Sequence, residues 1–237
     1  MGSVDHQGGR RRVVLWDVGG TLVQLACSQF EALDRALAAA GLQLEYLSAA
    51  ALASSSQAFI QRSLIWATPD EEESGYREIA ALMLDGCEVP VEPGQFESLA
   101  RALADYHQRY AVIPGIHEVL HDLARAGVRQ GVVSGWQPSL RKFLEYHNLL
   151  RYFEVVVGSG EERVLKPDRE LFRRALVRMG VSPERAVYVG NDPDLDIVPT
   201  EALGMRAILF DPRGRYGGGV ATTAELRERL LRELEVY

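Results

Sequence analysis

Residues 13–21 read VVLWDVGGT, an apolar run that ends in Asp17 and continues into two glycines and a threonine. The run is continuous rather than alternating, which is typical of a strand covered on both faces in a parallel sheet. Ligands of such sheets bind outside the carboxyl ends of the strands, where Asp17 stands. Gly19 and Gly20 allow a sharp backbone turn whose N–H groups approach an anion closely. The segment therefore predicts a buried strand that delivers a carboxylate to a phosphate-sized cleft.

This segment alone leaves other interpretations open. It also resembles the first phosphate loop of actin-fold sugar kinases, in which the aspartate serves a metal ion and a sugar hydroxyl and is never phosphorylated. A plain tight turn exposed to solvent could have the same residues. The kinase fold requires a β-hairpin after Thr21, whereas helical periodicity begins there, so the following sequence disfavours that interpretation.

Composition limits the possible partners. The chain has 237 residues, of which 47% are apolar and 25% charged, as in an ordinary globular protein. Its net charge of −7 argues against nucleic acid or an anionic membrane as the main partner, because both bind basic surfaces. Residues 1–12 lack the apolar middle of a signal peptide, and no apolar stretch is long enough to span a membrane. We therefore expect a cytoplasmic protein, monomeric or homodimeric, that acts on a small molecule.

Two kinds of periodicity divide the chain. Apolar residues recur at helical spacing in four segments between residues 24 and 111, without an intervening strand signal. From residue 114 helices alternate with strands, which is typical of a doubly wound parallel sheet. We expect strands at 128–134, 152–157, 186–189 and 206–210, and helices at 116–126, 138–149, 168–179, 194–203 and 222–234. The predicted fold is an α/β, Rossmann-like core of residues 12–23 and 112–237, with a four-helix cap inserted at 24–111 and a disordered leader at 1–11.

Three later strand ends carry polar groups that parallel order brings to the same edge as Asp17. These groups are Ser134-Gly135, Lys166-Pro167-Asp168, and Asn191-Asp192 with Asp196. Lys142 and Lys166 are the only lysines, and every other basic side chain except histidine is arginine. Lys142 lies on a predicted helix surface and is most simply a solvated charge. Lys166 lies at a strand-to-helix junction, which indicates a need for a compact ammonium group.

In these motifs and their order, from Val13 to Phe210, the chain resembles the haloacid dehalogenase-like (HAD) hydrolase superfamily. The resemblance is to members with a helical cap inserted after the first motif. It implies that Asp17 is the nucleophile, which attacks phosphorus to give an aspartyl-phosphate, and that Lys166 neutralises the nucleophile and the transferring group. It also implies catalytic and phosphate-binding roles for the groups around them, namely Ser134, Gly20, Thr21 and the N–H of Gly135.

The same resemblance implies a Mg²⁺ site. Its ligands would be Asp17, the carbonyl of Gly19, Asn191, Asp192 and Asp196. Sites rich in carboxylate oxygens suit Mg²⁺ better than soft metals. A cation would also offset the repulsion between a carboxylate and a phosphate, which is of order 4 kcal/mol at about 4 Å and intermediate dielectric.

Two positions depart from the family pattern. Gly19 stands where the usual phosphatase has a second aspartate, a general acid and base of a kind typically worth about 10²–10⁴ in rate. We therefore expect a slow phosphatase, in which water or a cap residue such as His107 replaces the missing general acid and base. Asn191 replaces a metal-binding aspartate, which removes one negative charge and weakens Mg²⁺ binding unless Asp192 or Asp196 compensates.

These departures keep two alternatives open beside a Mg²⁺-dependent phosphatase of a small phosphorylated metabolite. Metal-free 2-haloacid dehalogenases also lack the second aspartate, but they usually carry a tyrosine there and another six residues past the lysine. This chain has Gly19 and Phe172 at those positions. The other alternative is a catalytically impaired binding protein. In the cap, the side chains best suited to grip a polar substrate are Arg62, Trp66, Tyr76, Arg77, His107 and Arg109.

Overall fold

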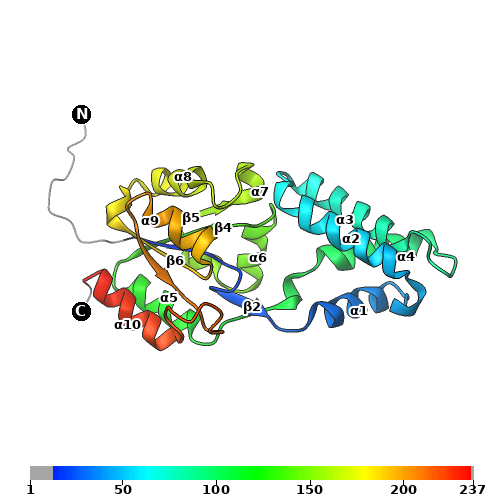
Figure 1. Ribbon diagram of the computed structural model, residues 1–237, viewed down its shortest axis with the longest axis horizontal. Coiled ribbons are helices and arrows are strands. Elements are labelled where there is room, and N and C mark those ends of the chain that lie inside the picture. Colours follow the sequence, from blue (N-terminus) through cyan, green and yellow to red (C-terminus); the bar gives the residue numbers. More distant parts are fainter. Residues whose placement is uncertain (1–12, 236–237) are drawn as a thin grey trace.

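A five-stranded parallel sheet forms the centre of one lobe in the computed structural model, which describes residues 13–235 (Figure 1). The predicted leader at residues 1–11 lies outside the described part. The strand order is β5-β4-β1-β6-β7, with β1 in the middle. The strands are β1 (Val13–Trp16), β4 (Arg129–Ser134), β5 (Val155–Gly158), β6 (Ala186–Gly190) and β7 (Arg206–Leu209). This order confirms the predicted Rossmann-like α/β fold.

The register of the three central strands positions Asp17. Trp16, the last residue of β1, pairs with Val132 of β4 and with Val189 of β6. Because the strands are parallel, Asp17 leaves the sheet between the end of β4 at Ser134 and the end of β6 at Gly190. The polar residues after these strands therefore meet at one edge, as the sequence predicts.

Helices cover both faces of the sheet. Val14 and Trp16 pack against α5 (Ile116–Arg125), α6 (Leu140–Tyr146) and α10 (Thr223–Glu233). Val13 and Leu15 point to the opposite face and pack against α8 (Arg169–Met179). All four β1 side chains are buried, and full burial of an apolar side chain of this size contributes roughly 1.5–3 kcal/mol. Burial on both faces explains why the sequence of β1 does not alternate.

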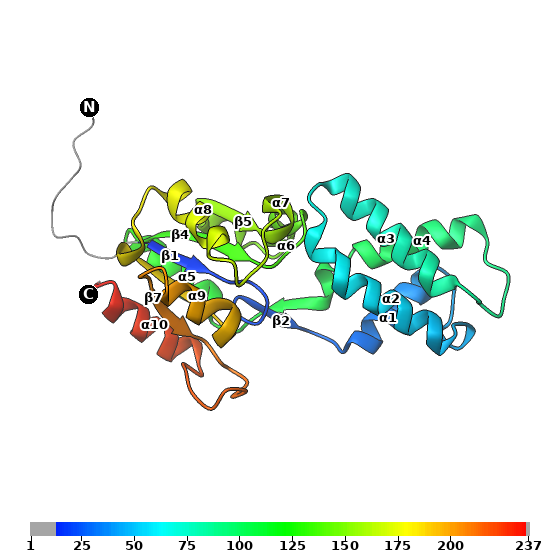
Figure 2. The same ribbon diagram turned by 45° about the horizontal axis from the view of Figure 1, so that its top comes forward.

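The second lobe consists of helices α1 (Gln29–Ala39), α2 (Ala49–Arg62), α3 (Pro69–Leu84) and α4 (Pro93–Ala104) (Figure 2). Local sequence explains where these helices begin. Ser28 and Glu31 form a capping box at the start of α1, and the side chain of Thr68 accepts a hydrogen bond from the N–H of Glu71 at the start of α3. The acidic residues in the first turn of α3 interact favourably with the helix dipole.

A two-stranded antiparallel ribbon joins the lobes. It pairs β2 (Val23–Leu25) with β3 (Tyr110–Val112). The expectation that no strand occurs between residues 24 and 111 was therefore wrong at both ends of that segment. Three-residue strands are too short to show a period-two pattern, and their pairing partners lie far apart in the sequence.

The connections also refine the predicted helices. In place of the predicted helix at 194–203 the structure has a π-helical turn, Pro193–Ile197, followed by α9 (Val198–Glu201). The predicted helix at 138–149 is shorter in the structure, where α6 spans Leu140–Tyr146. A further short helix, α7 (Ser159–Glu162), follows β5. Single 3₁₀ turns occur at Leu44–Tyr46, Ser63–Ile65, His107–Arg109, Leu150–Tyr152 and Pro183–Arg185. Within residues 13–235, no helix is both long and apolar enough to cross a membrane.

Candidate active site

Asp17 accepts hydrogen bonds from three side chains that come from different parts of the chain. Its Oδ1 accepts from Lys166 Nζ at 2.7 Å and from Ser134 Oγ at 3.0 Å. Its Oδ2 accepts from Thr21 Oγ1 at 3.2 Å. The side chain of Asp17 is only 9% exposed. The structure thus brings together four of the side chains that the sequence analysis singled out.

Lys166 lies between two buried carboxylates. Its Nζ is 2.7 Å from Asp17 Oδ1 and 2.7 Å from Asp196 Oδ1, and its side chain is 6% exposed. Burial alone would lower the pKa of Lys166, but the charges of Asp17 and Asp196 outweigh burial and raise it. The ammonium group therefore stays charged. Asp168 caps α8 by accepting from the N–H of Glu170, which fixes the start of the helix just after Lys166.

Asp196 holds the loop after β6. Its Oδ2 accepts from the backbone N–H groups of Asn191 at 3.0 Å and Asp192 at 3.1 Å. Burial raises the pKa of Asp196, and the nearby charge of Asp17 raises it further, while Lys166 opposes both effects. A side chain on Gly190 would collide with this carboxylate, because a Cβ there would lie 2.5 Å from its Cβ, Cγ and Oδ2 atoms. Asp196 is thus a positioning residue as well as a counter-charge for Lys166.

Tyr188 is a site residue that sequence reasoning missed. Its hydroxyl accepts from Lys166 Nζ at 2.8 Å and lies 3.1 Å from Asp196 Oδ1 and 2.9 Å from the carbonyl of Val133. The ring of Phe172 packs edge-to-face against the ring of Tyr188, with the two ring centroids 5.2 Å apart. The available signal was a tyrosine inside an otherwise aliphatic buried strand, since a buried phenol needs a hydrogen-bond partner.

The glycines after Asp17 shape the loop. Gly20 has a φ of +83°, and a Cβ there would lie 2.3 Å from the end of the Asn191 side-chain amide, so only glycine fits. The N–H of Gly20 donates to the carbonyl of Val23 at 2.7 Å, within the loop itself. In this structure Gly20 therefore contributes the turn rather than a free donor for phosphate. Gly135, the other predicted backbone donor, directly follows Ser134 at the end of β4.

Two of the predicted Mg²⁺ ligands, Asp192 and Asp196, have protein partners in this structure. Asp192 caps the following turn, because its Oδ1 accepts from the N–H groups of Asp194 and Leu195 at 2.9 Å, and its Oδ2 accepts from the hydroxyl of Tyr216. Asp196 is bound to Lys166 instead. Among residues 13–235, no group of three or more His, Cys, Asp or Glu side chains is arranged to hold a metal ion.

The side-chain amide of Asn191 lies between Gly19 and Arg215. When its Nδ2 donates to the carbonyl of Gly19 at 3.0 Å, its Oδ1 accepts from Arg215 Nη2 at 2.6 Å. In this orientation an N–H group faces the carbonyl oxygen that the resemblance assigns to the metal. The carboxylates of the predicted set, Asp17, Asp192 and Asp196, all accept hydrogen bonds from protein donors. The predicted Mg²⁺ site of Asp17, Gly19, Asn191, Asp192 and Asp196 consists of oxygen ligands, which suit Mg²⁺, and it stays a prediction.

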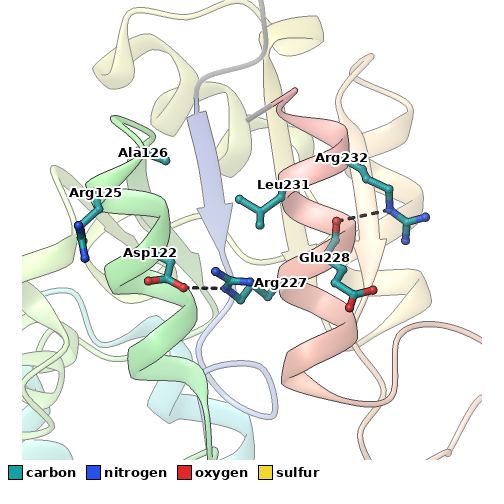
Figure 3. A pocket seen from close by; sticks show the side chains of 7 residues that line it. All are labelled: Asp122, Arg125, Ala126, Arg227, Glu228, Leu231 and Arg232. Carbon is teal, nitrogen blue, oxygen red and sulfur yellow. Dashed lines mark hydrogen bonds and ion pairs between the residues drawn. The ribbon is translucent and has the colours of Figure 1, made fainter. Parts of the chain in front are cut away.

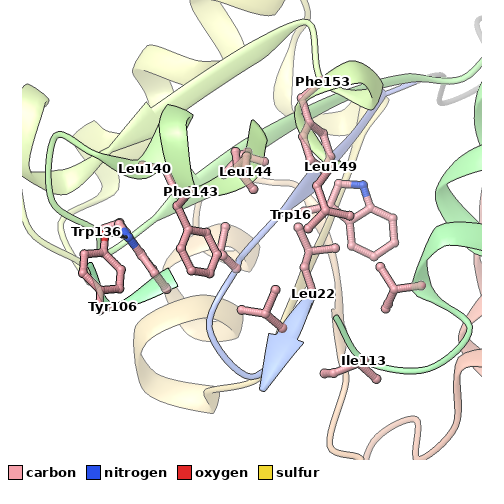
Figure 4. Packing of buried hydrophobic residues seen from close by; sticks show 14 of the residues in the cluster. Trp16, Leu22, Tyr106, Ile113, Trp136, Leu140, Phe143, Leu144, Leu149 and Phe153 are labelled. Atoms are coloured by element: carbon pink, nitrogen blue, oxygen red, sulfur yellow. Dashed lines mark hydrogen bonds between the residues drawn. The ribbon is translucent and has the colours of Figure 1, made fainter. Parts of the chain in front are cut away.

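A polar network connects this edge of the sheet to the helical lobe. Trp136 Nε1 donates to the hydroxyl of Tyr106 at 2.7 Å (Figure 4). That hydroxyl lies 2.6 Å from Ser139 Oγ. Glu72 of α3 accepts from both the N–H and the hydroxyl of Ser139. Burial raises the pKa of Glu72, although these two hydrogen bonds oppose the effect. The Trp136 ring lies over Gly19, since a Cβ on Gly19 would be 3.4 Å from Trp136 Cζ3.

Comparison with known proteins agrees with this geometry. The profile of the haloacid dehalogenase-like hydrolase family matches residues 14–210. The chain belongs to this family. A phosphoserine phosphatase of Thermus thermophilus is 34% identical to this HAD-like hydrolase over 60% of the chain and 57% of that enzyme, so the match spans little more than half of the relative.

Two further comparisons extend over most of the chain. Haloacid dehalogenase-like hydrolase domain-containing protein 3 of Danio rerio is 30% identical over 84% of this HAD-like hydrolase and 85% of that protein. The crystal structure of a HAD phosphatase from Thermococcus onnurineus has a TM-score of 0.67 at 23% identity and covers 92% of this chain and 97% of that one. The structural likeness supports the shared fold.

Most of the cap side chains that we expected to bind substrate in this HAD-like hydrolase contact other protein residues instead. Trp66 and Tyr76 are buried against each other and against Phe59. His107 stacks near Phe143 and Tyr146, and burial lowers its pKa. No contact links His107 to Asp17 in the described residues, so the structure does not support His107 as a substitute acid. The arginines bind other groups: Arg62 pairs with Glu78, Arg77 with Glu73 and Glu97, and Arg109 donates to Leu103 O.

Two pockets differ in their relation to the site. One of about 240 Å³ opens beside Gly19 and Asn191 and is lined by Tyr110, Arg213 and Arg215 among others. The other, of about 620 Å³, lies between α5 and α10 (Figure 3). All of its lining residues lie on α10, on α5 or directly after the last residue of α5. None of them lies at the carboxyl end of a strand. The first pocket is therefore the one that adjoins the loop after Asp17.

Replacing Lys166 with methionine is expected to destabilise the HAD-like hydrolase by about 3–5 kcal/mol at neutral pH, because two buried carboxylates would lose their shared counter-charge. In the variant the pKa of Asp196 would rise further, so the folded state would bind a proton more tightly than the unfolded state. Stability should then increase as the pH falls through that raised pKa. Urea unfolding at neutral and mildly acidic pH measures both effects.

Lys142→Met is the matched control, because Lys142 is the other lysine and is exposed on α6. It should change stability much less than Lys166→Met does, because the charge of Lys142 is exposed. Equal unfolding midpoints for the two variants would show that the ammonium of Lys166 does not stabilise the cluster.

Proposed function

We propose that the chain hydrolyses phosphate monoesters of small metabolites, with Asp17 as a covalent nucleophile. The main support for this proposal is the arrangement of hydrogen-bond donors around Asp17. Oδ1 is held by Lys166 and Ser134, whereas Oδ2 has one longer contact, from Thr21. We assign the attack to Oδ2, because it is the less strongly bound oxygen and the other contacts fix its direction.

The reaction then has two displacements at phosphorus. Asp17 Oδ2 forms a bond to phosphorus while the bond to the ester oxygen breaks, and the leaving oxygen takes a proton from water because Gly19 supplies no acid. Water next attacks the aspartyl-phosphate, which releases inorganic phosphate and a proton and restores the carboxylate. Lys166 offsets the repulsion between the carboxylate and the phosphoryl group throughout.

Two observations support a small anionic substrate. The pocket beside Gly19 has a volume of about 240 Å³ and is lined by Arg213 and Arg215. Relatives are named phosphoserine phosphatase, glyceraldehyde 3-phosphate phosphatase and phosphoglycolate phosphatase. These substrates are all small phosphate esters, and three-carbon or two-carbon esters fit a pocket of this size. We propose that the substrate belongs to this class.

A metal-free, dehalogenase-type hydrolysis is the second candidate. It is favoured by one specific observation, which is that residue 19, where the usual phosphatase carries a second carboxylate, is a glycine. In that reaction the carboxylate would attack carbon and expel halide.

A substrate panel tests the proposal against this second candidate. Phosphoserine, phosphoglycolate, glyceraldehyde 3-phosphate and 2-haloacids would each be incubated with the protein, and phosphate or halide release measured. Release of phosphate from at least one ester, absent in Asp17→Asn, is the expected result. Halide release without phosphate release would favour the dehalogenase, and the absence of both would favour a binding protein.

A further inference from the structure

We infer that the hydroxyl of Tyr188 holds Lys166 and the end of β4 together, so that both donors to Asp17 Oδ1 keep their places and Oδ2 is aimed at phosphorus. Tyr188 is then a positioning residue, which acts through Lys166 and Ser134 without touching the substrate. This role rests on the proposed function, in which Oδ2 is the attacking atom. It adds to that function the group that keeps the nucleophile in its reactive orientation.

The ammonium group of Lys166 has three N–H bonds, and the structure offers one acceptor to each of them. Asp17 Oδ1 and Asp196 Oδ1 each lie 2.7 Å from Nζ, and the hydroxyl oxygen of Tyr188 lies 2.8 Å from it. These distances are typical of charge-assisted hydrogen bonds. The ammonium group cannot turn about its Cε–Nζ bond without breaking these contacts. The hydroxyl thus helps to fix the N–H that points at Asp17.

The same hydroxyl also binds the end of β4. Its single proton can be donated to the carbonyl oxygen of Val133, 2.9 Å away, or to Asp196 Oδ1 at the longer distance of 3.1 Å. Val133 directly precedes Ser134, whose Oγ donates to Asp17 Oδ1 at 3.0 Å. Since β1 lies between β6 and β4, the phenol reaches across the central strand. One hydroxyl therefore connects both donors of Oδ1.

Packing alone does not account for a hydroxyl at this position. Tyr188 is 0% exposed, and its ring belongs to the apolar cluster on the α8 face of the sheet, where it packs against Phe172. A phenylalanine would supply the same ring. A buried hydroxyl lowers stability unless it is hydrogen-bonded, and its partners here are the groups that hold Asp17. The hydroxyl therefore serves the site rather than the core.

Tyr188→Phe removes only this hydroxyl. With millimolar MgCl₂ in the assay, kcat for the best ester should fall by about tenfold to hundredfold, because a displaced nucleophile reacts slowly. KM should stay within about threefold of the wild type, because the hydroxyl does not touch the substrate. Tyr146→Phe removes a hydroxyl from an exposed tyrosine on α6 and should change neither constant. A kcat for Tyr188→Phe within about threefold of the wild type would overturn the inference.

A packing variant separates lost position from lost stability. Leu176 of α8 is buried in the same apolar cluster as Tyr188, and no hydrogen bond to Lys166 depends on its side chain. Leu176→Ala should lower the thermal unfolding midpoint, because it leaves a cavity. At temperatures below that transition, its kcat should stay within about threefold of the wild type. An equal fall in kcat for Leu176→Ala and Tyr188→Phe would show that Tyr188 acts through stability alone.

Hydrogen exchange at the amine tests the inference without turnover. In protein labelled with ¹⁵N-lysine, only Lys142 and Lys166 give side-chain signals, and Lys142→Met assigns them. The Lys166 amine is buried and fully hydrogen-bonded, so it should exchange with solvent about tenfold or more slowly than the exposed amine of Lys142. Tyr188→Phe should accelerate exchange at Lys166 by about tenfold and leave Lys142 unaffected. Equal exchange at both wild-type lysines, or unchanged exchange in Tyr188→Phe, would contradict the role of Tyr188.

The two measurements distinguish failure of this inference from failure of the proposed function. Asp17-dependent phosphate release with an unchanged kcat in Tyr188→Phe would leave the proposed function intact and overturn the role of Tyr188. If the wild type hydrolyses no phosphate ester, the proposed function fails, and the exchange measurement by itself decides whether Tyr188 holds Lys166.

Discussion

Asp17→Asn is expected to lower the rate of phosphate ester hydrolysis at least about a thousandfold, because the amide oxygen is a poor nucleophile and cannot form the aspartyl-phosphate. The substitution preserves the shape of the side chain and an acceptor oxygen for Lys166. Steady-state phosphate release, measured with the best substrate of the panel, gives kcat for both proteins. Residual activity within about tenfold of the wild type would show that Asp17 is not the nucleophile.

The fold should survive this substitution. Lys166 would retain Asp196 as a counter-charge, so the cluster would change from a net charge of −1 to neutral. The thermal unfolding midpoint should therefore stay close to that of the wild type. Asp34→Asn makes the same change at an exposed position on α1 and should affect neither stability nor turnover. Loss of activity with retained stability identifies a chemical role for Asp17.

Gly19→Asp is expected to raise kcat by about 10²–10⁴ for esters with poor leaving groups, because a carboxylic acid beside Asp17 can protonate the departing oxygen. The backbone of Gly19 is not in the left-handed region, and a Cβ there would make an ordinary contact of 3.4 Å with Trp136 Cζ3. The position therefore accepts a side chain. Phosphate release from phosphoserine and from an aryl phosphate would be compared in the variant and the wild type.

The dependence on the leaving group provides the control. An aryl leaving group departs without help, so the aryl ester should gain little from Gly19→Asp, whereas phosphoserine should gain much. Gly19→Asn has the same shape but no acid and should not accelerate either substrate. Equal rates for the two variants would contradict the view that a missing acid limits this chain.

The sequence alone predicted those features of the fold and the site that depend on local sequence pattern. The unbroken apolar run of β1 predicted a buried strand of a parallel sheet, and the polar residues after β4 and β6 predicted where the strand ends would meet. The scarcity of lysine drew attention to Lys166, which does contact Asp17. Each of these inferences depends on periodicity or on the order of parallel strands, and both can be read along the chain.

Other features depend on contacts between distant segments and could not be predicted. Tyr188 belongs to a core strand, and only the tertiary structure shows that its hydroxyl reaches Lys166. Arg215 lies in a glycine-rich loop outside the motifs, and its partner Asn191 comes from a different strand end. The metal ligands were assigned from the resemblance to the family. Whether a carboxylate faces an ion, a lysine or a helix N-terminus is decided by packing, as Asp192 and Asp196 show.

The distribution of the two lysines has a practical consequence. Lys166 is buried between carboxylates, so reagents that acylate primary amines should modify the exposed Lys142 and spare Lys166. Lys142 lies on α6 within electrostatic reach of Glu72 of α3, that is, where the two lobes meet. A fluorophore coupled there would report the approach and separation of the lobes in solution, without any cysteine engineering.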